Sequence, residues 1–214
     1  MNFDLARQQM VEDQLIPRGI RDVRVLAAMR AVPRHLFVDE RLQRQAYDDT
    51  PLPIDAEQTI SQPYMVAVMS QALELQGHER LLEVGTGSGY QSAVLAELAA
   101  EVFTVERIES LARHARERLA HLGYASRVHV RVGDGTAGWL EEAPFDAVVV
   151  TAAVREVPRS LLQQLRAGGH MVLPLGEADL QGLARIRKDP GGLEMDYFGE
   201  CRFVKLIGDC GWEE

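Results

Sequence analysis

The stretch EVGTGSGY, residues 83–90, holds the residue spacing that points most directly to chemistry. Gly85, Gly87 and Gly89 recur at every second position between a strand-like run and a helix-like run. Glycines there let the backbone turn tightly and approach a ligand, while the following helix offers unpaired N–H groups. A dinucleotide fold uses Gly-x-Gly-x-x-Gly, yet the position that this pattern needs after Gly87 is Tyr90. The spacing therefore argues against NAD.

Three carboxylates stand at the expected strand ends around this loop. Glu83 would repel a pyrophosphate but attract the ammonium of an amino-acid ligand, directly or through water. Glu106 closes the next strand-like run, where an acidic group can accept both hydroxyls of a ribose. Asp134, in the GDG turn at 133–135, could accept from the exocyclic amine of adenine. Each feature alone is also ordinary turn chemistry, but their order on successive strand ends favours a nucleoside with an amino-acid tail, such as S-adenosylmethionine.

The elements that must position these groups alternate along the chain from residue 80 onward. Short β-rich runs separated by helical patterns predict a parallel sheet wrapped by helices. We expect strands at 80–85, 101–106, 127–134, 145–153 and 170–176, helices at 90–100, 108–123 and 158–169, and a final antiparallel hairpin from 183–189 and 195–207. The run at 145–153 is almost wholly apolar, as expected of a central strand covered on both faces.

The segment before this sheet is expected to be a helical lobe. Apolar residues recur at helical spacing over 3–15, and the IPRG turn at 16–19 should end that helix with a proline and a glycine. A second helix is expected to run to Pro33, and the polar, proline-bearing stretch 48–61 reads as a connecting loop. We expect one domain over 1–214, divided into an N-terminal lobe and loop (1–60), a donor-binding core (61–176) and C-terminal strands at the substrate edge (177–214).

Composition narrows the class of protein further. The chain has 214 residues, 46% of them hydrophobic and 26% charged, which is typical of a globular enzyme. Its formal charge of −9 disfavours nucleic-acid binding, and no stretch approaches the length of a membrane span. Cys201 and Cys210 could pair, but without a signal peptide we expect reduced thiols, a cytoplasmic location and a monomer. The six histidines are scattered, so we expect no metal site.

The segment TISQPYMVAVM, residues 59–69, lies directly before the first expected strand of the sheet. A loop and helix at this place can fold back over the strand ends, where parallel α/β sheets bind ligands, and act as a lid. Ser61 could then present its hydroxyl at the junction of a methyl donor and its acceptor. The same serine, just before Gln62 and Pro63, is equally suited to cap the helix that follows.

Taken together, these motifs resemble the protein-L-isoaspartate O-methyltransferase family over nearly the whole chain. The resemblance rests on VPRHLFV, TISQPYMVA, LLEVGTGSGYQSAVLA, VERI, GDGTAGW, FDAVVVTAA, QLRAGGHMVLPLG and RFVKLIG, of which TISQPYMVA is specific to the family. It implies a Rossmann-like α/β methyltransferase with a mostly parallel, doubly wound sheet, a helical N-terminal extension and C-terminal antiparallel strands. It also implies methyl transfer from S-adenosylmethionine to the carboxylate of L-isoaspartyl residues in damaged proteins and peptides. The methyl ester then starts repair through a succinimide, and S-adenosylhomocysteine is the other product.

The resemblance also implies roles for individual positions. The active-site serine of the family falls on Ser61. The donor-binding positions fall on Glu83, Gly85, Thr86, Gly87, Gly89, Glu106, Arg107, Asp134, Gly135 and Thr151, and the substrate-binding positions on Ser61, Gln62, Tyr64, Phe203 and Val204. The family usually has proline after that valine, where this chain has Lys205. Two other hypotheses remain open, namely a different methyl acceptor and a donor-binding module without turnover.

Overall fold

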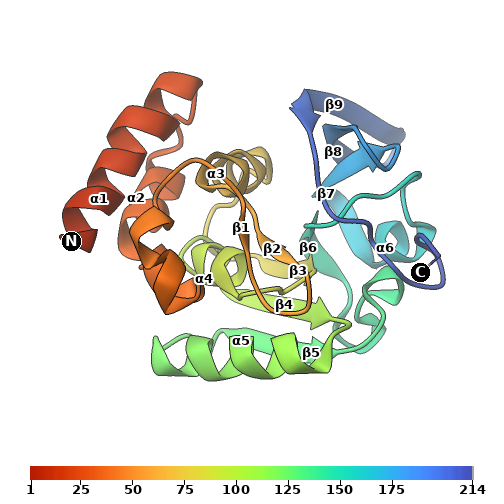
Figure 1. Cartoon of the computed structure of the whole chain (residues 1–214). Coiled ribbons are helices and arrows are strands. Elements are labelled where there is room, and N and C mark those ends of the chain that lie inside the picture. The colour runs from red at the N-terminus through yellow and green to blue at the C-terminus, as the bar shows by residue number, and fades with distance from the viewer. Residues whose placement is uncertain (214) are drawn as a thin grey trace.

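The fold is built around one seven-stranded sheet, as Figure 1 shows for the computed structural model, which describes residues 1–213. The strand order is β5-β4-β3-β6-β7-β8-β9. The strands are β3 (Arg80–Val84), β4 (Glu101–Glu106), β5 (Val128–Val132), β6 (Phe145–Val150), β7 (Leu165–Gly176), β8 (Gln181–Asp189) and β9 (Gly192–Cys201). Strands β3 to β7 pair in parallel, whereas β7–β8 and β8–β9 pair antiparallel. The expected mixed sheet with a C-terminal hairpin is confirmed.

Helices pack around the sheet. The first two helices, α1 and α2, lie farther from the strands, as Figure 1 shows. The α-helices are α1 (Phe3–Gln9), α2 (Val23–Ala31), α3 (Pro63–Ala72), α4 (Tyr90–Ala96), α5 (Glu109–His121) and α6 (Arg159–Gln164). Short 3₁₀ turns are η2 (Ile16–Arg18), η3 (Arg34–Phe37), η4 (Glu40–Gln45), η5 (Gly135–Ala137) and η6 (Leu140–Glu142). Within residues 1–213, no helix has the length and apolar character needed to cross a bilayer.

The first helical segment follows its sequence signals, with one irregularity. Helix α1 continues as a π-helix, η1 (Met10–Leu15), and then as the 3₁₀ turn that contains Pro17. The helical segment ends at Gly19, whose φ of 91° is left-handed and suits glycine. Proline and glycine therefore end the helix as expected, although residues Met10–Leu15 before them have π-helical hydrogen bonds.

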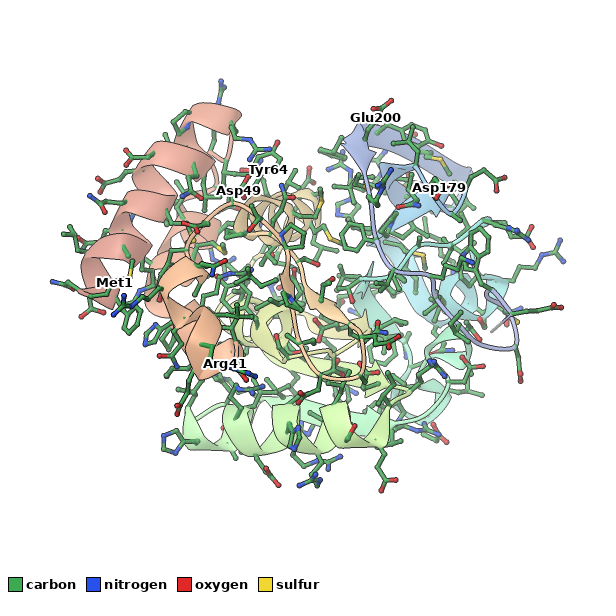
Figure 2. The ribbon with its side chains drawn as sticks, in the orientation of Figure 1. Met1, Arg41, Asp49, Tyr64, Asp179 and Glu200 are labelled. Carbon is green, nitrogen blue, oxygen red and sulfur yellow. The ribbon has the colours of Figure 1, made fainter. Side chains whose placement is uncertain are left out.

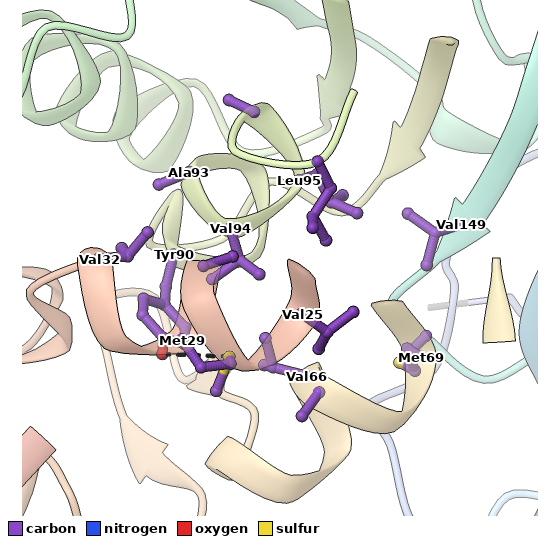
Figure 3. Packing of buried hydrophobic residues seen from close by; sticks show 14 of the residues in the cluster. Val25, Met29, Val32, Val66, Met69, Tyr90, Ala93, Val94, Leu95 and Val149 are labelled. Carbon is purple, nitrogen blue, oxygen red and sulfur yellow. Dashed lines mark hydrogen bonds between the residues drawn. The ribbon is translucent and has the colours of Figure 1, made fainter. Parts of the chain in front are cut away.

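Side chains alternate between the two faces of the sheet and form two apolar layers. Leu81 and Val102 belong to the layer that includes helices α2, α3 and α4, whereas Leu82, Phe103 and Leu161 of α6 belong to the other. Figure 3 shows the first layer, where the Tyr90 hydroxyl donates to the sulfur of Met29 at 3.8 Å. Because this layer contains residues from the N-terminal helices and from the sheet, the N-terminal lobe shares one core with the rest of the chain.

The helix expected over 158–169 is wrong in its second half. Helix α6 ends at Gln164, and Leu165 already pairs with Phe145 as the first residue of β7. A Cβ on Gly169 would lie only 2.5 Å from the Asp146 carbonyl oxygen, so glycine lets this segment approach β6 closely. Gln164 uses its side chain instead to hold the Trp139 N–H, at 2.8 Å. Gly169 therefore serves strand pairing and does not end the helix.

The loop expected over 48–61 contains a small hairpin, β1 (Leu52–Pro53) and β2 (Thr59–Ile60). Its tip is unusual because Ala56 and Glu57 both have left-handed φ values, 55° and 57°, which favour glycine. This hairpin leads directly into Ser61 and helix α3.

Candidate active site

The candidate site lies at the carboxyl ends of β3 and β6, where the strand order of the sheet reverses direction. Open parallel sheets bind ligands at such a switch point. Gly85 follows β3, and its N–H donates to the Val105 carbonyl at 2.9 Å. Thr151 follows β6, and its N–H donates to the Val84 carbonyl, also at 2.9 Å. The first bond ties the start of the glycine loop to β4, and the second holds the end of β3 beside the end of β6.

Close approach explains the first glycine of the loop. Gly85 has a φ of 97°, and a Cβ at this position would overlap the Thr151 hydroxyl oxygen. That hydroxyl donates to the Gly85 carbonyl at 2.7 Å, so the contact between the two segments is specific. At Gly89 the φ of 87° is again left-handed, and the residue forms the N-cap of α4. The loop is therefore shaped by backbone requirements that glycine meets.

Glu106 is the carboxylate that the structure brings to the cavity beside this loop. Its Oε2 accepts from the Gly87 N–H at 2.8 Å, and its Oε1 accepts from the Ile108 N–H at 3.0 Å. Each carboxylate oxygen can accept a second hydrogen bond, so Glu106 can still accept hydrogen bonds from a ligand in the cavity. Neighbouring hydroxyl groups are the ligand chemistry that such a fixed carboxylate suits.

A donor-side cavity, as we name it, opens beside Glu106. Most sequence-predicted donor positions line it: Gly85, Thr86, Gly87, Glu106, Arg107, Gly135 and Thr151. Residues that were not expected line it as well, namely Gln58, Thr59, Ile60, Val66, Val84, Ser88, Tyr90, Gln91, Val105, Ile108, Ala152, Lys205, Leu206 and Ile207. The apolar members of this second set would suit a flat base next to the polar groups of the loop.

Two predicted donor-binding carboxylates lie outside the lining of this cavity. Asp134 instead accepts from the backbone N–H groups of Thr136 and Asp209, at 2.8 and 2.9 Å, and so fixes the turn after β5. Glu83 is fully buried on the α4 face of the sheet, where Ser92 donates to its Oε2 and its Oε1 has no hydrogen-bond partner. Burial raises the pKa of the Glu83 carboxyl to about 7. Their direct contact with a donor therefore stays a prediction.

A second cavity, the acceptor-side cavity, adjoins the first. It contains all the predicted substrate-binding residues: Ser61, Gln62, Tyr64, Phe203 and Val204. The remaining lining residues are Arg18, Pro51, Thr59, Met65, Thr151, Glu200, Cys201 and Arg202. Figure 2 shows its two sides, with Tyr64 on the helical side and Glu200 across from it on the strand side. Thr59, Ser61, Thr151 and Val204 line both cavities, so Ser61 stands where the two meet.

The alternative that Ser61 caps helix α3 is wrong. The N-cap is Gln62, and its own side chain makes no capping bond. Asp49 from the preceding loop caps the helix instead, accepting from the Tyr64 N–H at 2.9 Å. Within residues 1–213 the Ser61 hydroxyl has no hydrogen-bond partner, so it is available to a ligand in either cavity.

The acceptor-side cavity also contains a thiol. Cys201 is unpaired, and burial raises the pKa of its thiol to about 11. The thiolate is the nucleophilic form of cysteine, so burial keeps Cys201 from competing for an electrophilic group.

Lys205, the departure from the family pattern, lies at the edge of the donor-side cavity. Its Nζ is 5.1 Å from the centre of the Trp212 ring, and the chain at Lys205 bridges to Ala153. Trp212 is buried and donates its indole N–H to the Ala153 carbonyl at 2.9 Å. The lysine side chain is therefore directed toward the C-terminal segment.

A family model and curated relatives match almost the whole chain. The family model described as "Protein-L-isoaspartate(D-aspartate) O-methyltransferase (PCMT)" matches residues 6–211. Protein-L-isoaspartate O-methyltransferase 1 of Syntrophobacter fumaroxidans is 57% identical over 213 residues, covering 100% of this chain and 99% of the relative. The Geobacter metallireducens protein-L-isoaspartate O-methyltransferase is 55% identical and covers 99% of this chain and 98% of its own length.

Two solved structures are similar over almost the whole chain. One is a protein-L-isoaspartate O-methyltransferase with a TM-score of 0.85 and 28% identity, covering 96% of this chain and 67% of that one. The other is a putative enzyme of the same name from Plasmodium falciparum in complex with S-adenosyl-L-homocysteine. It has a TM-score of 0.81 and 26% identity, and covers 94% of this chain and 98% of its own.

Proposed function

The chain belongs to the protein-L-isoaspartate O-methyltransferase family, and we propose that its two adjoining cavities divide the reaction between a donor side and an acceptor side. The enzyme transfers a methyl group from S-adenosylmethionine to the free carboxylate of L-isoaspartyl residues in damaged proteins. The resulting methyl ester starts repair by way of a succinimide.

The donor-side cavity fits S-adenosylmethionine. Glu106, fixed by two backbone N–H groups, would accept from the ribose hydroxyls, and Ile108 and Leu206 would contact the adenine ring. Gly85 and Gly135 also line this cavity, where they would leave the backbone without a side chain between it and the ligand. When bound, S-adenosylmethionine supplies an electrophilic methyl group on its sulfonium, and S-adenosylhomocysteine remains after transfer.

The acceptor needs little activation by the protein. An acceptor carboxyl with a pKa near 4 is ionised at neutral pH, so no general base is required. The protein contributes by holding the two reactants in line and excluding water, which can supply several kcal/mol. We propose that Gln62, Tyr64, Phe203 and Val204 hold the peptide, and that Ser61 orients its carboxylate.

The position of Ser61 carries this proposal. It lines both cavities, and its hydroxyl is not used within the described chain. A hydroxyl at this junction can donate to the acceptor oxygen that does not attack, and thereby direct the other oxygen at the methyl group. Hydrogen bonds to charged groups contribute about 1.5–3 kcal/mol.

The test is a Ser61→Ala variant assayed with labelled S-adenosylmethionine and matched isoaspartyl and aspartyl peptides. We expect kcat/KM for the isoaspartyl peptide to fall roughly 10- to 100-fold while the donor Kd stays within about twofold. Ser110→Ala, an exposed serine of α5, is the matched control and should behave like the unmodified enzyme. Equal losses in turnover and donor binding would contradict an acceptor role for Ser61.

The same assay separates the other hypotheses. Transfer to neither peptide by the unmodified chain, with donor binding intact, would favour another acceptor or a binding module. Transfer to the isoaspartyl peptide alone supports the proposed acceptor.

We further propose that the chain acts as one domain, as a cytoplasmic monomer that takes both isoaspartyl peptides and whole proteins but no nucleic acid. The common core of the N-terminal lobe and sheet supports the single domain, and the charge of −9 supports the exclusion of nucleic acid. Gel filtration with light scattering and cell fractionation test the monomer and the location.

A further inference from the structure

The segment that carries Ser61 is fixed by a residue outside that segment, which belongs to the N-terminal lobe and loop. Helix α3 begins at Pro63, directly after Ser61 and Gln62, and no side chain of its own caps it. The first N–H groups of a helix need acceptors, and a negative charge at that end is favourable. Asp49, in the loop before β1, supplies both when its Oδ1 accepts from the Tyr64 N–H at 2.9 Å.

Asp49 makes two further contacts to residues that line the acceptor-side cavity. Its Oδ2 accepts from the Gln62 amide at 3.4 Å and forms an ion pair with the Arg18 guanidinium. Arg18 in turn lies over the Tyr64 ring, 3.5 Å from its centre. Figure 2 shows Asp49 beside Tyr64 on the helical side of the acceptor-side cavity. The Asp49 carboxylate therefore binds the Tyr64 backbone N–H, the Gln62 side-chain amide and the Arg18 guanidinium.

The environment of Asp49 favours a specific arrangement over a loose surface pair. Only 20% of its side chain is exposed, against 44% for Arg18, so both partners are partly withdrawn from water. Surface ion pairs contribute little alone, but a carboxylate that also caps a helix is restricted in direction. Moving Asp49 would shift the N-terminal turn of α3 and the side chains on it.

The other end of α3 is attached to the lobe independently. Gln71 accepts from the N–H groups of Arg21 and Asp22, at 2.7 and 2.9 Å, and donates to the Gly19 carbonyl at 3.3 Å. This contact also stabilises the packing of the helix against the lobe, but it touches neither cavity. Gln71 is therefore a matched control for a purely structural effect.

We propose that Asp49 is a positioning residue of the methyl transfer. It fixes the N-terminal turn of α3 so that Ser61, Gln62 and Tyr64 face the isoaspartyl peptide. The proposal rests on the acceptor role of this side of the site. It requires that loss of Asp49 affects the peptide far more than the donor.

The experiment compares Asp49→Ala, Asp49→Asn and Gln71→Ala in the full chain. It measures kcat and KM for an isoaspartyl peptide, the donor Kd by calorimetry and the melting temperature. We expect Asp49→Ala to lower kcat/KM for the peptide roughly 10- to 100-fold, because small misplacements at a reacting centre have effects of that size. The donor Kd should stay within about twofold. Asparagine also caps helices well, so Asp49→Asn should recover most of the activity, with the peptide KM about threefold above that of the parent.

Gln71→Ala should lower the melting temperature as much as the alanine variant of Asp49 but leave peptide kcat/KM within about twofold. Equal kinetic losses in both would overturn the proposal, since the effect would then be general destabilisation. If Asp49→Ala loses donor binding through misfolding, Asp49→Asn decides, and an unchanged peptide KM would overturn the idea. Absence of transfer by the unmodified chain would instead count against the acceptor assignment itself.

Discussion

The buried carboxyl of Glu83 gives a quantitative prediction about stability and pH. Its side chain is fully buried, Ser92 donates to one of its oxygens, and the other oxygen has no partner. Burial raises its pKa from 4.5 to about 7. The perturbation is Glu83→Gln, which keeps the shape and a hydrogen-bonding oxygen but removes the ionisation.

The sign follows from linkage between protonation and folding. Below pH 4.5 the carboxyl is protonated in both folded and unfolded chains and has no effect on the pH dependence of stability. As the pH rises from 4.5 through about 7, the unfolded chain ionises first, so the folded protein loses stability. At about 1.4 kcal/mol for each pKa unit, the full loss is about 3 kcal/mol. An amide at this position does not ionise, so the advantage of the Glu83→Gln variant should grow from near zero at about pH 4.5 to about 3 kcal/mol at about pH 8.

Urea unfolding at pH 4.5, 6, 7 and 8 measures this difference. Glu79→Gln is the matched control, because there the pKa is lowered: burial acts to raise it, but the N–H groups of Gln76 and Gly77, each at 2.7 Å, outweigh burial. This variant should be less stable than the parent at neutral pH and approach it as the carboxyl of Glu79 protonates in acid. A constant offset for Glu83→Gln across the pH range would refute the reasoning.

Two further substitutions test the backbone of the site. Gly85 has a left-handed φ, and a Cβ there would overlap Thr151, so Gly85→Ala should destabilise the enzyme by about 2–4 kcal/mol and weaken donor binding in calorimetry. Gly123 is equally left-handed but has open space around it, so Gly123→Ala should destabilise the enzyme by only about 1 kcal/mol. Similar losses of stability for both variants would argue against the close contact. Glu57→Gly should relieve the left-handed hairpin tip and raise the melting temperature by about 2–4 °C, whereas Glu117→Gly within α5 should lower it; a decrease for Glu57→Gly would contradict the strain.

Local patterns in the sequence predicted most of the fold. Strand β4 was predicted with its observed bounds, because its β-rich run lies between two helical patterns that mark where the strand begins and ends. The end of α6 was not, since Gly168 and Gly169 resemble a helix stop, whereas pairing of Leu165 with Phe145 draws the chain into β7. A contact between residues so far apart along the chain has no signal in the local pattern.

The site divides in the same way. The glycine loop and Glu106 lie beside the cavity because strand ends of a parallel sheet meet at one edge. Asp134 stands at such an end too, but its carboxylate holds its own turn. The cap of α3 by Asp49 joins residues from separate elements and could not be read from spacing. The apolar residues Ile60 and Leu206 of the donor side, from opposite parts of the chain, were missed for the same reason.

The composition of the acceptor-side cavity has a consequence for how such enzymes can diverge. Apart from Thr151, every residue that lines it comes from the chain before β3 or after β8. The donor loop and its strands lie between these two flanking segments. New acceptors can therefore be acquired by exchanging the flanks as a matched pair around an inherited centre, while exchange of one flank alone would leave mismatched halves facing each other.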